Sequence, residues 1–145
     1  MKIKWFIETV CLLLIILFIY TATNKLVAHE TFKFQLMGHK LLLKYIPIVA
    51  IAVPAVEIII SLMLIFPRTK LAGLYASAIL LLVFTAYIVY MFNFYPTTPC
   101  SCGGIISKLS WKGHIIFNVV FMLLALIAAR LTKKQETRDR VFSVS

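Results

Sequence analysis

Four long apolar runs limit what this chain can fold into more than any other feature of its sequence. A helix that crosses the hydrocarbon core of a bilayer needs about 20 consecutive apolar residues, because water is not there to bond to its backbone. The sequence therefore predicts an all-α integral membrane protein, a four-helix bundle in which residues 1–131 form a single transmembrane domain. A polar, basic tail over residues 132–145 is expected to be disordered at its end. The expected spans are residues 5–22, 46–66, 71–94 and 113–131.

The first run and the segment after it allow alternatives. A cleaved signal peptide is one, since the small residues Thr21, Ala22 and Thr23 follow a stretch rich in leucine and isoleucine. We favour a retained helix, because the run is long for a signal sequence and no clean Ala-x-Ala site follows it. Residues 24–45 are polar and basic with scattered apolar residues, so we expect an interfacial amphipathic helix there.

The basic residues predict how the chain is oriented. Fifteen bases and five acids give a net charge of +10, which in a soluble protein would suggest nucleic-acid binding. Here 62% of the residues are hydrophobic and most bases flank the apolar runs, so the partner is the lipid bilayer and nucleic acid is excluded. Four spans place both termini on one face, which carries nine bases against six on the other. The positive-inside rule then predicts a multi-pass protein of the inner (plasma) membrane with both termini and the 132–145 tail in the cytoplasm.

Residues 99–104, Pro-Cys-Ser-Cys-Gly-Gly, suggest chemistry rather than lipid solubility. Cysteines two apart in an extended chain lie at or beyond the Cα separation of about 4.4–6.8 Å that disulfides span, so only a tight turn closes the ring. A strained, exposed disulfide is labile and oxidising, and this loop is predicted to lie outside, where disulfides persist. Cys100 and Cys102 are therefore candidate catalytic residues for thiol-disulfide exchange. A permanent brace, two thiols without a role, and a soft-metal site with a nearby histidine are the alternatives.

Glu57 is an acid inside the second apolar run, roughly 16 Å deep when counted from Ile46 at about 1.5 Å per residue. An ionisable group at that depth is costly and is by default a functional candidate. The same count places Thr85, Tyr87 and Asn118 at depths of about 14, 10 and 8 Å. If these four side chains turn inward, they form a polar pocket beneath the cysteine loop, suited to a proton relay or a quinone head group. The alternative is a neutral, hydrogen-bonded Glu57 that only locks the helices together.

Small residues four apart predict where the helices approach closely. In a membrane helix such pairs let two backbones come together, because no bulky side chain separates them. Close contacts are therefore expected along the third and fourth spans. The pairs are Ala72 and Ala76, Gly73 and Ser77, and Ala125 and Ala129.

Four motifs within residues 5–131 resemble the MauE family of methylamine-utilisation membrane proteins and, more loosely, the DoxX-like four-helix membrane proteins. The resemblance implies a component of a thiol-disulfide redox system that acts with a thioredoxin-like partner outside the membrane in disulfide formation or protein maturation. The looser likeness implies a link to quinone. The alternative function is a non-enzymatic assembly or metal-handling protein whose Cys-x-Cys loop is structural or binds a soft metal. The motifs are Thr23-Asn24-Lys25-Leu26, Pro54-Ala55-Val56-Glu57, Phe84-Thr85-Ala86-Tyr87 and Cys100-Ser101-Cys102-Gly103-Gly104.

The predicted orientation can be tested by labelling. In a chain whose native cysteines are replaced by serine, Ser107→Cys should react with an impermeant maleimide in intact cells, after any outer membrane is permeabilised, because residues 96–110 are expected outside. Arg68→Cys, between the second and third spans, should react only after lysis. If Arg68→Cys reacts in intact cells and Ser107→Cys does not, the orientation is opposite to the predicted one.

Overall fold

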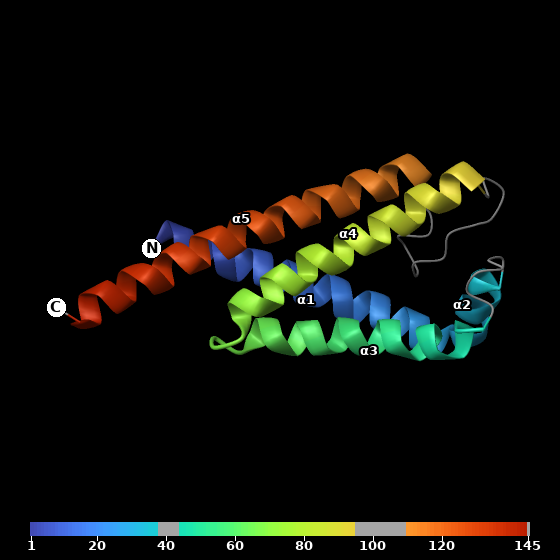
Figure 1. The fold of residues 1–145 in the computed structure, drawn as a ribbon, viewed down its shortest axis with the longest axis horizontal. Helices are drawn as coiled ribbons and strands as arrows, with labels where there is room; N and C mark the ends of the chain where they lie inside the picture. Colours follow the sequence, from blue (N-terminus) through green and yellow to red (C-terminus); the bar gives the residue numbers. More distant parts are fainter. Residues whose placement is uncertain (38–43, 95–109, 145) are drawn as a thin grey trace.

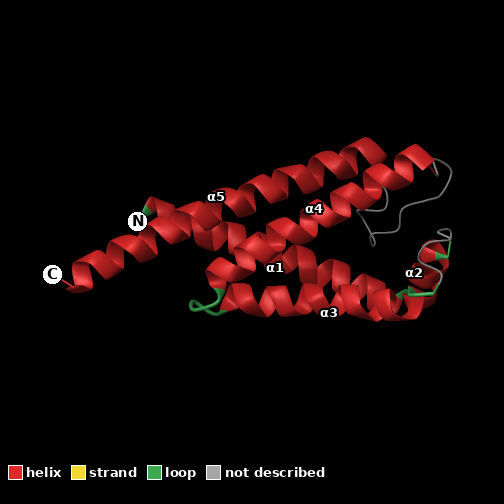
Figure 2. Cartoon of the chain, in the orientation of Figure 1, coloured by secondary structure: helices red, strands yellow, loops and turns green. Residues whose placement is uncertain are grey.

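The computed structural model describes residues 1–37, 44–94 and 110–144, which form α-helices and no strand (Figure 2). All of these helices except α2 are long and apolar enough to cross a membrane. The prediction of an all-α protein with four spans is therefore confirmed, while the Cys-x-Cys loop lies outside the described residues. The helices are α1 (Lys2–Val27), α2 (His29–Leu36), α3 (Ile46–Ile65), α4 (Lys70–Phe94) and α5 (Trp111–Val144).

The four long helices alternate in direction, so both ends of the chain lie at one end of the bundle (Figure 1). α1 packs most extensively on α3 and α4 packs most extensively on α5, and contacts of α3 with α4 and of α1 with α5 join the two pairs. A short turn links α3 to α4, and the hydroxyl of Thr69 closes it by donating to the carbonyl of Met63 at 2.9 Å. The two pairs meet near this turn and diverge towards the opposite end (Figure 1).

The half of the bundle nearest the termini is an apolar core. Gly73 and Ser77 of α4 are buried there, as are Ala125 and Ala129 of α5, whereas Ala72 is exposed. Two of the three predicted pairs of small residues therefore lie in the interior. The larger residues that pack around them include Ile7, Leu14, Ile60, Leu64, Leu74 and Leu81.

Two helices, α1 and α5, extend further towards the C-terminus than the sequence predicts. α1 continues to Val27, past the predicted end at residue 22, and α2 provides the short helix expected within residues 24–45. The expectation of a disordered end to the tail is wrong, because α5 runs to Val144. Residues 132–144 contain neither glycine nor proline and are rich in residues that favour helix, so the helix has no reason to stop. At 34 residues α5 is about 51 Å long and projects beyond the other helices at the end where the termini lie (Figure 1).

Gly73 allows a test of the close contact between α3 and α4. A Cβ atom at this position would lie 3.2 Å from the backbone nitrogen of Leu64 and 3.2 Å from the carbonyl carbon of Met63, and backbone cannot move aside easily. Gly73→Val should therefore lower the free energy of unfolding by about 1–3 kcal/mol, the usual cost of overpacking. Thermal unfolding in detergent measures this. Ala72→Val, on the exposed face of the same helix, is the matched control, and equal melting temperatures for the two variants would contradict the close contact.

Candidate functional site

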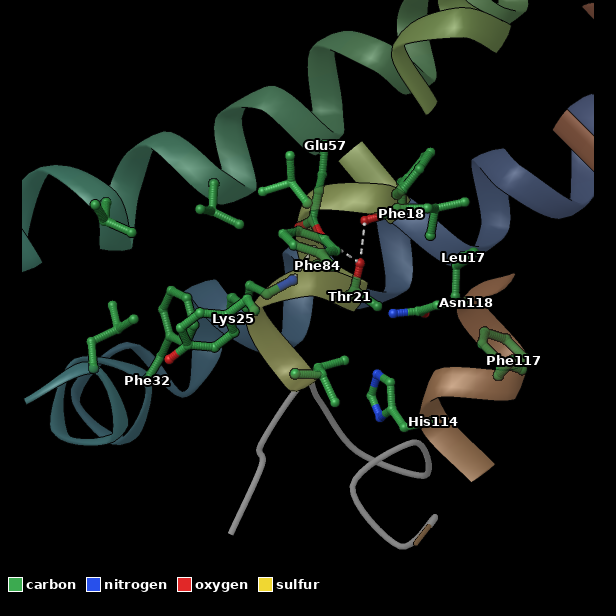
Figure 3. Close-up of a pocket in the computed structure, with 17 residues that line it drawn as sticks. Leu17, Phe18, Thr21, Lys25, Phe32, Glu57, Phe84, His114, Phe117 and Asn118 are labelled. Atoms are coloured by element: carbon green, nitrogen blue, oxygen red, sulfur yellow. Dashed lines mark hydrogen bonds and ion pairs between the residues drawn. The ribbon is translucent and has the colours of Figure 1, made fainter. Parts of the chain in front are cut away.

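A cavity of about 250 Å³ occupies the half of the bundle opposite the termini, and Figure 3 shows the residues that line it. Residues of α1, α3, α4 and α5 surround it, and two residues of α2 complete its wall. Most of the wall is apolar, with several phenylalanine side chains, so the polar groups that reach it are few and distinct. They are Thr21 and Lys25 from α1, Glu57 from α3, Tyr87 from α4, and His114 and Asn118 from α5.

A buried ion pair lies on one side of this cavity. The amine of Lys25 is 2.6 Å from Oε1 of Glu57, and the hydroxyl of Thr21 donates to the same oxygen at 3.0 Å. Glu57 is 0% exposed and Lys25 only 6%. Thr21 and Lys25 are one helical turn apart, so α1 presents both to α3 from the same face. The two charges cancel where either alone would be very costly.

An aromatic ring from a third helix also contacts the ion pair. The amine of Lys25 lies 5.0 Å from the centre of the Phe84 ring, within the range of a cation–π interaction. Phe84 belongs to α4, so this contact joins α4 to the pair formed by α1 and α3.

Two polar atoms beside the cavity lack partners among the described residues. They are Oε2 of Glu57, which can only accept a hydrogen bond when ionised, and Nδ2 of Asn118, which can only donate. Both atoms are buried, and an unpaired buried polar group costs about 1–3 kcal/mol. Such groups are rare in native proteins and call for an explanation, of which a missing ligand or water is one.

α5 contributes a second buried polar residue next to Asn118. His114 is 6% exposed and precedes Asn118 by one helical turn, so both lie on the face that borders the cavity (Figure 3). Both belong to the first eight residues of α5. Across the described ranges, no three His, Cys, Asp or Glu side chains gather in a way that could hold a metal ion.

The structure brings three of the four predicted pocket residues to the cavity. Glu57, Tyr87 and Asn118 line it, whereas Thr85 does not, and the Thr85 hydroxyl instead donates to the carbonyl of Leu81 in its own helix at 2.7 Å. The candidate catalytic residues Cys100 and Cys102 lie outside the described part of the chain.

Three residues of the site were not identified as such from the sequence. The sequence places Lys25 in a polar, basic segment and Thr21 among the small residues of a possible cleavage site, and no pattern distinguishes His114. Two features of the sequence point to Lys25: it belongs to one of the four motifs, and Glu57 needs a counter-charge inside the membrane. Positions Thr21 and Lys25 differ by four, which puts them on one helix face.

Comparison with known proteins yields one similarity. The family model described as methylamine utilisation protein MauE matches residues 3–131. No curated protein and no solved structure matches the chain. The matched region contains the four apolar helices up to residue 131 of α5, every residue that lines the cavity, and both Cys100 and Cys102.

The buried ion pair predicts a non-additive pattern of stabilities. Lys25→Met should lower the free energy of unfolding by about 3–5 kcal/mol, because it leaves the Glu57 charge buried without compensation. Adding Glu57→Gln should restore most of the loss, because the double variant buries no charge. Denaturant titration in detergent, followed by circular dichroism, measures all three chains.

A second ion pair supplies the matched control. Lys33 lies 3.2 Å from Glu30, whose side chain is 86% exposed, so Lys33→Met should cost less than about 1 kcal/mol. A Lys25→Met variant as stable as Lys33→Met, or a double variant no more stable than Lys25→Met, would show that the buried pair does not behave as a coupled unit.

Proposed function

The chain belongs to the methylamine utilisation protein MauE family, and from this membership we propose that it is a membrane thiol-disulfide redox protein acting with a thioredoxin-like partner outside the membrane. In this proposal Cys100 and Cys102 alternate between a disulfide and a dithiol, and the reaction serves disulfide formation or maturation of an extracytoplasmic protein. The family match and the four apolar helices support the membrane setting.

One observation carries the proposal beyond the family match. α4 ends at Phe94 and α5 begins at Trp111, so the segment with the two cysteines is attached at the end of the bundle that contains the polar cavity. His114 and Asn118 lie only about 5 and 10 Å along α5 from its first residue. The helices thus hold buried polar groups close to the attachment points of the cysteine segment, in the half of the bundle away from the termini.

The proposed chemistry is thiol-disulfide exchange. A thiolate of the partner attacks one sulfur of the Cys100–Cys102 disulfide and forms a mixed disulfide, and the second partner thiolate then attacks this bond and leaves as part of a partner disulfide. Two electrons pass to the Cys100–Cys102 pair, which becomes a dithiol and must be re-oxidised by an acceptor. The one-residue spacing favours this direction, because a strained disulfide is the more oxidising kind.

The proposed location follows from the same charge distribution as before. We place the chain in the inner (plasma) membrane with both termini in the cytoplasm and the cysteine segment outside. Lys25 no longer counts among the bases of the outer face, since it is buried in α1 and paired with Glu57. The bias of nine bases against the remaining five is therefore wider than the sequence alone suggested.

Thiol alkylation in cells tests this function. Cys100 and Cys102 should shift together between reduced and oxidised forms with the supply of oxidant, whereas Cys11 should stay reduced, because it is only 3% exposed and packed in the core. Alkylation with a maleimide of high mass, before and after reduction, shows the two forms on a gel. Cys102→Ser should accumulate a mixed disulfide with a thioredoxin-like protein.

Cys11→Ser is the matched control and should trap no partner. A Cys100–Cys102 pair that stays oxidised under mild thiol reductants would instead indicate a structural brace. Co-purification of stoichiometric metal with the reduced pair would indicate metal handling.

A further inference from the structure

We propose that the outward face of α5 binds an anionic phospholipid. The acyl chains of the lipid lie against the part of the helix inside the membrane, and its phosphate lies against the bases that follow. The site belongs to the leaflet at the end of the bundle where the termini lie, so it is far from the cavity (Figure 1). It does not rest on the proposed redox function.

An apolar stripe runs along the outward face of α5 within the membrane. Its four residues follow one another at intervals of three or four, so they share one face of the helix. Each is between 47% and 63% exposed, which shows that this face is turned away from the other helices and towards lipid chains. The residues are Ile116, Val120, Leu123 and Ile127.

The same stripe continues as a row of bases. Arg130, Lys134 and Arg138 follow the last apolar residue of the stripe at intervals of three, four and four, and all three are exposed. Lys133 and Arg140, also exposed, flank this row. At 3.6 residues per turn the five bases occupy an arc of about 160° around the helix. α5 therefore carries one continuous face that is apolar within the span and basic beyond it.

The acids of this segment lie on the other face. Glu136 and Asp139 follow Thr132 by four and seven residues, and Thr132 is only 8% exposed, so the acids lie on the side of α5 that is buried in the bundle. None of the ion pairs within the described part of the chain involves α5. Membrane orientation alone requires bases near the span but does not require them to share one face. The separation of bases from acids therefore points to a partner on the outward side.

The bases lie at the depth of the lipid head groups. Residues 113–129 contain no Lys or Arg, so Arg130 is the first base after the apolar part of α5. The polar region of a bilayer is about 5–8 Å thick on each side, and Lys134 is only about 6 Å beyond Arg130 along the helix. Arg138 is about 12 Å beyond, but long side chains on a helix point back towards its N-terminus, which here is the membrane side.

The combination of the two parts of this face selects a lipid. Clusters of Lys and Arg next to a membrane span attract anionic head groups, and the guanidinium of Arg fits two phosphate oxygens. An acidic protein would match the bases alone. A phospholipid matches both parts, because its chains reach the depth of Ile127 while its phosphate stays at Arg130. A zwitterionic head group gains less, because its own positive charge compensates the phosphate.

Competition between two lipids tests the site. The purified full chain in detergent is mixed with equal amounts of phosphatidylglycerol and phosphatidylcholine that carry the same oleoyl chains, and native mass spectrometry measures which lipid stays bound. Occupancy by phosphatidylglycerol should be at least about fivefold higher, the gain expected from one base at a membrane surface. Equal occupancy by the two lipids would overturn the proposal.

Exchange of charges between the two faces of α5 shows whether the preference belongs to the outward face. The exchanged chain carries Lys134→Glu with Glu136→Lys and Arg138→Asp with Asp139→Arg, which leaves its composition and its net charge of +10 unchanged. The preference for phosphatidylglycerol should fall below about twofold, because two bases leave the face and two acids enter it. An unchanged preference would show that lipid binding follows net charge alone and would overturn the assignment.

Arg130→Lys with Arg138→Lys is the matched control, since it keeps the charge of the outward face and should keep the preference. If circular dichroism shows that the exchanged chain does not fold, a chain with Arg130→Gln, Lys134→Gln and Arg138→Gln, all at exposed positions, takes its place with the same expected loss. Binding of a polyglutamate peptide together with equal occupancy by the two lipids would assign the bases to an acidic protein and overturn the proposal.

Discussion

A carboxylate surrounded by hydrocarbon must find its counter-charge inside the protein, and this requirement organises the bundle. Glu57 lies near the middle of α3 and is fully buried, and Lys25 near the end of α1 reaches it at 2.6 Å. The pair can form only when α1 and α3 lie side by side in one register, and these two helices are indeed among the most extensively packed. Phe84 then brings α4 against the amine. Once one charge is buried, the positions of three helices are constrained.

The spans were predictable, because hydropathy alone determines which segments can cross a bilayer. The helix boundaries were not predictable, because an ion pair and helix propensity set them rather than hydropathy. α1 continues past residue 22 since Lys25 is neutralised by a residue 32 positions away, which no local pattern reveals. α5 continues past residue 131 because helix propensity does not end where hydrophobicity ends. In both cases the apolar run gives the length of the membrane crossing rather than the length of the helix.

Part of the candidate site was predictable, because a polar side chain inside a membrane span is energetically costly and therefore marks a functional candidate. Glu57 and Asn118 are polar groups where such groups are expensive, and both line the cavity. Thr85 followed the same reasoning but can satisfy its hydroxyl on its own helix, at the carbonyl of Leu81, so depth alone does not force it inward. Lys25 and His114 lie near helix ends, where a base is ordinary, and only the fold reveals that they are buried.

The two halves of the bundle are packed differently, and this difference explains why a cavity exists. Near the termini, buried small residues such as Gly73 and Ala129 let the helices approach closely. Towards the other end the two helix pairs diverge, and larger side chains such as Phe18 and Phe117 surround the space without filling it (Figures 1 and 3). A uniformly tight bundle would have to bury its polar groups against each other or exclude them. Because one half holds the helices together, the other half can keep a donor and an acceptor that have no partner among the described residues, at the end of the bundle where α4 ends and α5 begins.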